Sequence, residues 1–384
     1  MYKAIKELEI YISDGNYSSK YPRSEEFVDA GIPFIRGNNM VDGDIVDDEM
    51  YYITQEKHGI LLKGHVKAGD VLITTRGNIG QVAIVPARHE DSNINAQIVL
   101  LRTDEETLYN RYLLWALQSQ KAREQYSSLQ TGTALKQLPV GKLEQVRIKI
   151  TDIDTQQRVA DNLDKVNALI KSRKRELLLL DDFIKARFVE LFANCKNMVS
   201  LNDACSIITD GTHQPPKFQD TGIPFIFVSN LANNTVTYNA EKFISEETYA
   251  ELYRRTPIEI GDILLSTVGS YGHPAVVLED RKFLFQRHIA YLKPKRDMIN
   301  SFYLHGALLA PDGQRQIEEK VKGIAQKTLN LSEIRKIVIP LPGINEQNEF
   351  ESFVKQINKS KVAVQKALDE TQILFDSLMQ KYFG

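Results

Sequence analysis

The chain consists of two diverged copies of one segment about 191 residues long. Residues 27–35 read Phe-x-Asp-x-Gly-Ile-Pro-Phe-Ile, and residues 218–226 repeat that pattern after a shift of 191 positions. Residues 69–72 read Gly-Asp-Val-Leu and return at 261–264 as Gly-Asp-Ile-Leu. Two such segments fill the 384-residue chain. Because solenoid units are only about 20–50 residues long, each copy is a whole domain with its linker.

Each copy is expected to begin with an α+β domain, at residues 1–150 and 196–341. Apolar residues at helical spacing predict one helix over residues 108–129. Alternating apolar residues predict a strand that closes each domain, at 146–150 and 337–341. The repeated domain therefore mixes short strands with helices.

Each copy is expected to end in a long helix, at residues 151–195 and 342–384. Apolar residues recur there every seven positions, and they are Leu163, Ile170, Leu177, Ile184 and Leu191 in the first copy and Val354, Leu368, Phe375 and Tyr382 in the second. This spacing is typical of coiled coils. Asp154 and Asn345 are the expected N-caps. We predict an antiparallel coiled coil that joins the two domains with pseudo-two-fold symmetry.

Composition excludes several classes of protein without naming a function. The formal net charge is −2, so the basic excess of many nucleic-acid-binding proteins is absent, although a local basic face is sufficient for DNA. The two cysteines form no disulfide framework, as in proteins of a reducing compartment. No signal peptide and no apolar run of about 18 residues is evident. A cytoplasmic location with no membrane contact is expected.

The two copies carry motifs that resemble a known family. Residues 210–215 read Asp-Gly-Thr-His-x-Pro and precede the Gly-Ile-Pro-Phe-Ile motif. This order is similar to target-recognition domains in specificity subunits of type I restriction-modification systems. The first copy keeps Asp14 and Gly15 but continues with Asn16-Tyr17-Ser18-Ser19. Contacts made by the Thr-His-x-Pro piece are therefore not carried over to it.

The resemblance implies a function and a set of partners. Specificity subunits recognise an asymmetric, bipartite sequence in double-stranded DNA, with one domain for each half and a fixed spacer between them. They assemble with two methyltransferase subunits and with ATP-dependent restriction subunits that translocate and cut DNA. The long helices would then serve as spacer and as docking surface.

The chain itself offers no catalytic motif. An adenine methyltransferase needs an Asn/Asp-Pro-Pro-Tyr/Phe motif, and the sequence has none. The glycine pair Gly77 and Gly80 is too closely spaced for a phosphate-binding loop. Cys195, Cys205 and His213 match no zinc-binding spacing, and the seven histidines show no evident pairing. We therefore expect no catalytic residue, no metal and no cofactor in this chain, with S-adenosylmethionine, magnesium and ATP bound by partner subunits.

Candidate DNA contacts follow from comparing the copies. Matched positions should build the fold or contact phosphate, whereas base-reading positions should differ between two domains with different targets. Arg, Asn and Gln are the side chains that pair with guanine or adenine edges. The candidates are Arg36, Asn38, Arg76, Asn78 and Gln81 in the first copy, His213, Ser229, Ser270, Tyr271, His273 and Arg287 in the second, and the matched Lys136 and Lys327 for phosphate.

Each of these positions also has an explanation that does not involve DNA. Exposed residues diverge between duplicated copies without a change of function, and solvated lysines can match by chance. The turn Arg76-Gly77-Asn78 is the strongest single candidate, because it lies between two predicted strands, at 71–74 and 82–85.

Two other functions compete with DNA recognition. One is a coiled-coil scaffold that carries two protein-interaction modules, and salt-insensitive indifference to DNA would favour it. The other is a self-contained restriction enzyme, which the missing motifs argue against.

Overall fold

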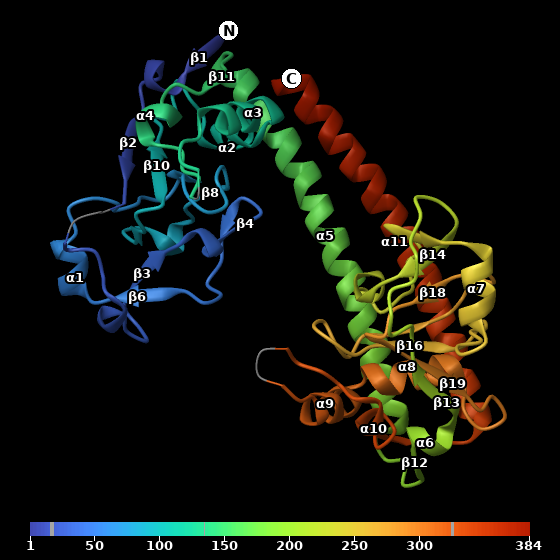
Figure 1. Ribbon diagram of the computed structural model, residues 1–384. Helices are drawn as coiled ribbons and strands as arrows, with labels where there is room; N and C mark the ends of the chain where they lie inside the picture. The colour runs from blue at the N-terminus through green and yellow to red at the C-terminus, as the bar shows by residue number, and fades with distance from the viewer. Residues whose placement is uncertain (16–18, 134, 324–325) are drawn as a thin grey trace. The chain divides into compact units, whose positions relative to one another are not determined.

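The chain divides into two compact units in a computed structural model (Figure 1). Unit 1 comprises Met1–Ser172 with Ala367–Gly384, and unit 2 comprises Arg173–Lys366. All residues are described except 16–18, 134 and 324–325. Each unit holds one α+β domain together with parts of both long helices.

The central sheet of unit 1 has four antiparallel strands, in the order β2 (Tyr11–Asp14), β10 (Ile98–Arg102), β7 (Val71–Thr74) and β8 (Val82–Ile84). Strands β7 and β10 are apolar at nearly every position because both faces of the sheet are covered. Val71 and Val99 belong to one buried cluster, whereas Leu72 and Leu100 belong to another. The predicted strand–turn–strand at residues 71–85 is confirmed.

Smaller elements complete the domain of unit 1. Strand pairs join β1 (Tyr2–Ala4) to β11 (Arg147–Lys149) and β4 (Met40–Val41) to β5 (Asp44–Ile45). A small sheet has β3 (Ile32–Ile35) between β6 (Tyr51–Ile53) and the parallel β9 (Asn93–Ile94). The α-helices of the domain are α1 (Gln55–Ile60), α2 (Asn110–Gln118), α3 (Gln120–Leu129) and α4 (Val140–Leu143). Short 3-10 helices lie at Ile5–Glu7, Ser24–Glu26, Gly37–Asn39 and Ala87–His89.

Unit 2 repeats this topology except for the β4–β5 pair, which has no counterpart among its described residues. Its central sheet has the order β13 (Cys205–Asp210), β19 (Ile289–Pro294), β16 (Ile263–Ser266) and β17 (Pro274–Val276). Its small sheet has β14 (Ile223–Ile226) between β15 (Lys242–Ile244) and β18 (Leu284–Phe285), and β12 (Met198–Ser200) pairs with β20 (Val338–Pro340). Its helices are α6 (Leu201–Ala204), α7 (Glu246–Tyr253), α8 (Ser301–Leu309), α9 (Pro311–Lys320) and α10 (Leu331–Ile334), with a 3-10 helix at Val228–Leu231. The duplication in the sequence is thus a duplication of the fold.

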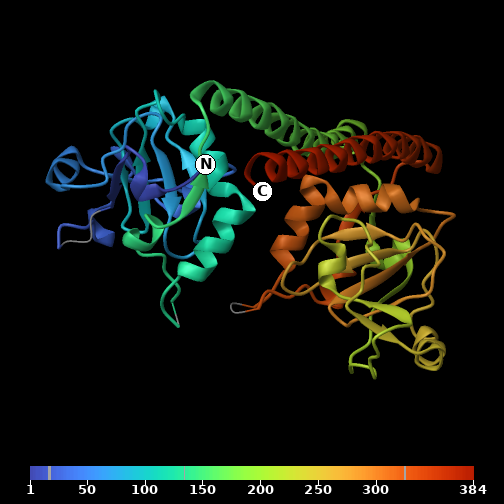
Figure 2. The same cartoon turned by 90° about the horizontal axis from the view of Figure 1, so that it is seen from above.

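The two long helices, α5 (Ile153–Phe192) and α11 (Ile344–Phe383), contact each other in antiparallel orientation inside each unit (Figure 2). In unit 1, Asn162 Nδ2 of α5 donates to the Tyr382 hydroxyl of α11 at 3.3 Å. In unit 2, Lys361 Nζ of α11 lies 2.6 Å from a carboxylate oxygen of Asp181 on α5. The predicted antiparallel pairing is confirmed. Neither long helix, nor any other helix in the described residues, has the apolar run that crossing a membrane requires.

The heptad register is right along most of α5 and wrong at its end. Leu163, Ile170 and Ile184 are buried, but Leu191 is exposed while Phe188 and Phe192 are buried. A straight helix has 3.6 residues per turn, so a seven-residue repeat drifts around it. At its end α5 follows the helical period and buries the two phenylalanines.

The prediction of one helix over residues 108–129 is wrong. Ser119 has an extended backbone, with ψ at 152°, and it separates α2 from α3. Its hydroxyl accepts a hydrogen bond from the Ala122 amide at 3.3 Å, so it caps α3. Serine favours such caps because its side chain replaces a missing helical partner, and apolar periodicity does not register this.

The predicted N-caps are also wrong, each by two positions. Asp152 Oδ1 accepts from the Thr155 amide at 2.9 Å and caps α5, so Asp154 lies inside the first turn. At α11, Glu346 accepts from the Gly343 amide at 2.9 Å, and Asn345 lies inside the helix. In both cases a carboxylate near the helix start satisfies a backbone amide that has no helical partner.

Unit 2 is expected to lose stability as the pH falls below about 6.5, partly because of His305 on α8. Its Nε2 lies 3.2 Å from the backbone oxygen of Asn234 and 3.1 Å from that of Pro274, and removal from water lowers its pKa from 6.5. The unfolded chain therefore takes up the proton first, and stability is lost between about pH 6.5 and the lowered pKa. Thermal unfolding from about pH 7.5 to 5 should show a shallower loss in His305→Asn than in the original chain. Equal slopes would contradict this role.

Candidate nucleic-acid interface

The turn predicted to read DNA joins β7 to β8 in unit 1. Gly77 and Gly80 have φ values of +69° and +84°, a region that favours glycine. A Cβ on Gly80 would lie 2.7 Å from a ring carbon of Tyr126, so this position has no room for a side chain. Arg76 and Asn78 are exposed beside these glycines. The backbone of the turn is thus fixed while two of its side chains face outward.

A distant loop pairs with this turn and brings the matched lysine beside it. Arg76 forms a β-bridge with Gln137, and the Leu138 amide donates to the Thr75 oxygen at 2.9 Å. Lys136, exposed, directly precedes Gln137. We call this arrangement the turn–loop pair of unit 1, residues 75–81 with 135–138.

Unit 2 contains the same arrangement, the turn–loop pair of residues 267–273 with 326–329. Val268 bridges Thr328, and the Gly269 amide donates to the Lys327 oxygen at 3.3 Å. Ser270 is exposed at the tip of this turn. Candidates from sequence positions nearly 60 residues apart, such as Ser270 and Lys327, therefore lie together.

The second lysine is partly neutralised, unlike the first. Lys327 Nζ lies 3.0 Å from Glu318 and 3.2 Å from the Tyr271 hydroxyl, which itself bonds Glu318 at 2.5 Å. The Glu318 carboxylate raises the pKa of Lys327, so the ammonium group stays charged. The same ion pair, however, already uses this ammonium group inside the domain. Lys136 has no such ion pair among the described residues. The two lysines match in sequence but differ in their electrostatic surroundings.

Arg287 lies at a cavity of about 300 Å³ beside the turn–loop pair of unit 2. The cavity is also lined by His288, Thr267 and Asp210. Burial and the neighbouring Arg287 lower the pKa of His288. Its Nε2 lies 3.4 Å from the Nε of Arg287, so a neutral ring accepts from the guanidinium. The cavity therefore offers a cation, a neutral imidazole and a carboxylate at one place.

The Asp-Gly motif shapes the chain beside this cavity. Asp210 binds His213 at 2.9 Å and Arg255 at 3.1 Å. A Cβ on Gly211 would lie 2.2 Å from the Phe285 oxygen, and one on Gly15 in unit 1 would lie 2.2 Å from the Asn95 oxygen. The glycine thus permits the same close backbone approach in both copies. Asn16, Tyr17 and Ser18 lie outside the described residues.

Three of the candidates are held inside their own domains. Arg36 stacks on Tyr51, with 3.5 Å from its guanidinium carbon to the ring centroid, and donates to the Glu49 oxygen at 2.6 Å. Gln81 donates to the Met40 oxygen at 2.7 Å, and His273 Nδ1 lies 3.1 Å from Asn234 Oδ1. By contrast, the side chains of Asn38 and Ser229 are exposed.

Sequence comparison did not single out a matched asparagine that shapes this region. Asn39 accepts from the Arg36 amide at 3.0 Å and donates to the Val46 and Asp48 oxygens. Asn230, 191 positions later, accepts from the Phe227 amide at 2.9 Å and donates to Thr237 and Asn239. The sequence signal that could have found them is that both copies have asparagine at this position, 191 residues apart. Both asparagines close the loop that follows the first strand of the small sheet.

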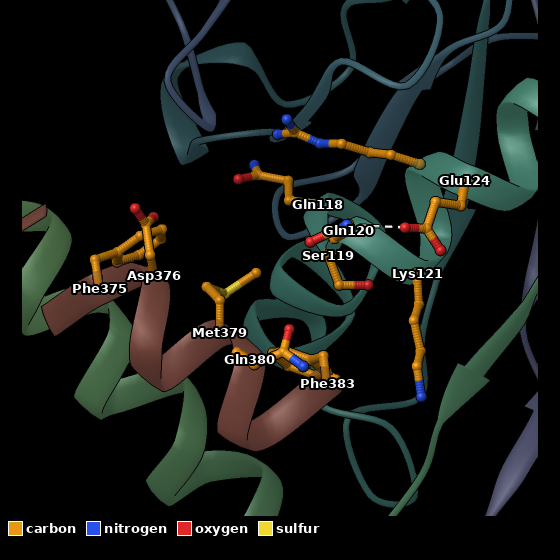
Figure 3. A pocket seen from close by; sticks show the side chains of 12 residues that line it. Gln118, Ser119, Gln120, Lys121, Glu124, Phe375, Asp376, Met379, Gln380 and Phe383 are labelled. Carbon is orange, nitrogen blue, oxygen red and sulfur yellow. Dashed lines mark hydrogen bonds between the residues drawn. The ribbon is translucent and has the colours of Figure 1, made fainter. Parts of the chain in front are cut away.

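A second cavity, of about 670 Å³, lies between α3 and the end of α11 in unit 1 (Figure 3). Gln120 and Glu124 on α3 face it and share a hydrogen bond of 2.9 Å. Phe375, Met379 and Phe383 of α11 line the other side. None of the candidate DNA contacts lines this cavity.

Comparison with known proteins assigns both halves to one family. The family model described as "Type I restriction modification DNA specificity domain" matches residues 14–179 and again 196–371. The specificity subunit of the type I restriction enzyme EcoBI from Escherichia coli is 24% identical over 390 residues, covering 92% of this chain and 79% of that subunit. The MjaIX specificity subunit from Methanocaldococcus jannaschii is 21% identical and covers 95% and 88%.

Solved structures share the fold at low sequence identity. The S subunit of a type I restriction-modification system from M. genitalium superposes with a TM-score of 0.56 at 14% identity, covering 100% of this chain and 96% of that one. A chain from a structure on complex assembly and conformational transition of the type I system gives 0.56 at 17% identity, covering 100% and 97%. With the domain matched twice along its length, the chain belongs to the family of type I restriction-modification DNA specificity proteins.

Proposed function

We propose that this chain is the sequence-recognition subunit of a type I restriction-modification complex. Its domain at residues 1–150 reads one half of a bipartite DNA target, and its domain at 196–341 reads the other. One observation carries this proposal. The turn–loop pairs of units 1 and 2 have the same backbone arrangement, but they expose different side chains. Arg76 and Asn78 in unit 1 stand where unit 2 has Val268 and Ser270.

The long helices are the proposed docking surface for partner subunits. Large apolar side chains are exposed on them: Leu169, Leu178, Leu179, Phe183, Val189 and Leu191 on α5, and Val362, Ile373 and Leu374 on α11. Apolar surface of this kind marks protein–protein contacts. Two methyltransferase subunits bind there, and restriction subunits join them for cleavage. The chain itself catalyses nothing and works in the cytoplasm, and S-adenosylmethionine, magnesium and ATP are bound by the partners.

The decisive experiment maps methylation in cells. The chain is co-expressed with a cognate methyltransferase subunit, and modified adenines are located across the genome. A single split motif is expected. Exchanging residues 1–150 for the equivalent domain of another family member should change one half of the motif and leave the other half intact. A change in both halves would contradict the assignment of one domain to each half, and salt-insensitive indifference to DNA would favour a protein-binding scaffold instead.

Arg76→Ala is expected to weaken discrimination at one position of the first half-site. A bidentate arginine–guanine contact contributes about 1–3 kcal/mol, or roughly 5- to 150-fold. Binding of the methyltransferase complex to duplexes with single base changes measures this loss. Lys136→Ala is the matched control from the same turn–loop pair. As a phosphate contact it should weaken binding to all sequences alike and reduce the salt slope by about 1. Equal behaviour of the two variants would contradict the assignment.

A further inference from the structure

Two histidines and an aspartate meet in the domain of unit 1. His58 is on α1, His65 follows it in the chain, and Asp91 directly precedes the segment that leads into β9. Ligand atoms of all three lie within 4.8 Å of one another. The imidazole centroids are 4.5 Å apart, with the rings nearly perpendicular. The structure thus pairs two of the histidines that looked scattered in the sequence.

The hydrogen-bond partners of the two rings indicate which ring nitrogens carry protons. His58 Nδ1 lies 2.5 Å from the Asn93 side-chain oxygen, and His65 Nε2 lies 2.6 Å from the Leu61 backbone oxygen. Both oxygens are acceptors, so these nitrogens carry the hydrogens. The lone pairs then belong to His58 Nε2 and His65 Nδ1. Metal-binding histidines are oriented in this way, by donating the other ring N–H to a carbonyl or carboxylate oxygen.

Both lone pairs face one carboxylate. His58 Nε2 lies 3.3 Å from Asp91 Oδ2, and His65 Nδ1 lies 3.9 Å from Asp91 Oδ1. Two lone pairs against a carboxylate are repulsive unless positive charge lies between them. A divalent cation supplies that charge and bonds to all three groups at once.

We propose that His58 Nε2, His65 Nδ1 and the Asp91 carboxylate bind a divalent transition-metal ion of the Zn²⁺ class. Two imidazoles with one carboxylate are a common zinc donor set. Ligand atoms about 2.0–2.1 Å from a tetrahedral ion lie roughly 3.3 Å apart, close to the distances of 3.3 and 3.9 Å. The site opens to solvent, because the side chain of Asp91 is 69% exposed while that of His58 is 6% exposed. One coordination position remains for water.

The backbone holds these ligands in place before any ion binds. The Val66 amide donates to the Ser92 oxygen at 3.0 Å, and the Asp91 amide donates to the Val66 oxygen at 2.9 Å. His65 and Asn93 form a β-bridge. Asp91 itself has a φ of +59°, which sets its side chain at the turn. The ion would therefore join α1 to β9 and stabilise the small sheet of this domain.

The second copy of the domain shows that the fold does not need these residues. The shift of 191 aligns β9 with β18 and the cap of α1 with that of α7, so Tyr249 and Lys282 stand where His58 and Asp91 stand. Lys282 Nζ lies 5.6 Å from the Tyr249 ring centroid, a cation–π contact. Unit 2 places a lysine where unit 1 has the carboxylate. The metal site is specific to unit 1.

The test is zinc titration of the full-length chain after treatment with a chelator. Calorimetry should give one high-affinity Zn²⁺ per chain, and the ion should raise the melting temperature. His65→Ala and Asp91→Asn should each weaken binding at least about tenfold, since even second-layer changes around a metal cost about 10–100-fold. Asn tolerates the left-handed backbone of residue 91, so the second variant keeps the fold.

A histidine–carboxylate pair elsewhere provides the control. His213→Ala removes the His213–Asp210 pair of unit 2 and should leave the zinc stoichiometry at one. Metal-free variants should melt like the metal-free original chain, which separates lost binding from lost folding. Absence of tight zinc binding, or equal affinity in Asp91→Asn, would overturn the site. These readouts need no DNA, so they stand apart from the proposed recognition function.

Discussion

Replacing Phe350 with alanine is expected to destabilise the fold of unit 2 by about 3–5 kcal/mol, the cost of removing a buried phenylalanine. Phe350 on α11 is 0% exposed. Its ring centroid lies 5.4 Å from that of Phe188, 5.8 Å from that of Phe192 and 6.4 Å from that of Tyr303. The side chain thus joins α11, α5 and α8, and alanine would leave a cavity among three elements.

Phe183→Ala is the matched control for this substitution. Phe183 also lies in unit 2 and contacts Phe353 of α11 at 5.3 Å, but it is 51% exposed. Its loss should cost only about 1 kcal/mol, because half of its surface is already in water. Urea unfolding followed by circular dichroism compares the two variants. Equal losses would contradict the central place of Phe350 in this core.

Asp164→Ala is expected to cost about 2–4 kcal/mol in unit 1. Asp164 on α5 accepts two hydrogen bonds from Arg111 of α2, at 2.8 and 2.6 Å. It also accepts one from the indole N–H of Trp115 at 2.8 Å. Removal leaves a guanidinium and a buried N–H without their partner, which costs more than the bonds themselves contribute. Asp164 therefore stabilises the packing of α2 against α5.

The only tryptophan of the chain reports this change directly. Trp115 fluorescence should follow unfolding of unit 1 at a lower urea concentration in Asp164→Ala. Asp161→Ala is the control, because this carboxylate lies on the same helix but is exposed, and it should cost less than about 0.5 kcal/mol. An unchanged midpoint in Asp164→Ala would show that the contact contributes no stability.

The two copies join domain to helix with different chemistry at equivalent positions. Trp115 corresponds to Gly306, and a Cβ there would lie 2.7 Å from the Phe350 ring. The large aromatic ring at this contact is Trp115 on α2 in unit 1 and Phe350 on α11 in unit 2. Arg111 and Asp164 correspond to Phe302 and Lys355, whose contact is a cation–π pair at 5.4 Å. Single residues are therefore not interchangeable between the copies, although the backbones repeat.

Much of this architecture was predictable because it depends on repeats and on the spacing of apolar residues within short segments. The shift of 191 residues revealed two equivalent domains, and apolar runs predicted the strands at 71–74 and 82–85. Heptads predicted two helices that pair, and the structure has them in antiparallel contact. Burial imposes a period on each element, and that period survives in the sequence even when the residues diverge.

The candidate site was only partly predictable, because its geometry depends on contacts between distant segments. The turn at residues 76–78 was found, but its pairing with Gln137 follows from tertiary folding. The stacking of Arg36 on Tyr51 likewise depends on packing between separate segments. The helix ends at Ser119 because the Ser119 hydroxyl accepts a hydrogen bond from the Ala122 amide and caps the next helix.

The sequence by itself determined that this chain is a duplicated α+β domain with two pairing helices, and its motifs pointed to the family. Tertiary structure alone decided which polar side chains are held inside the domain and which face outward. It also brought His58 and His65 to one carboxylate 26 residues further along the chain. Periodicity reports which face of an element is buried, whereas the meeting of side chains from separate elements depends on how those elements pack.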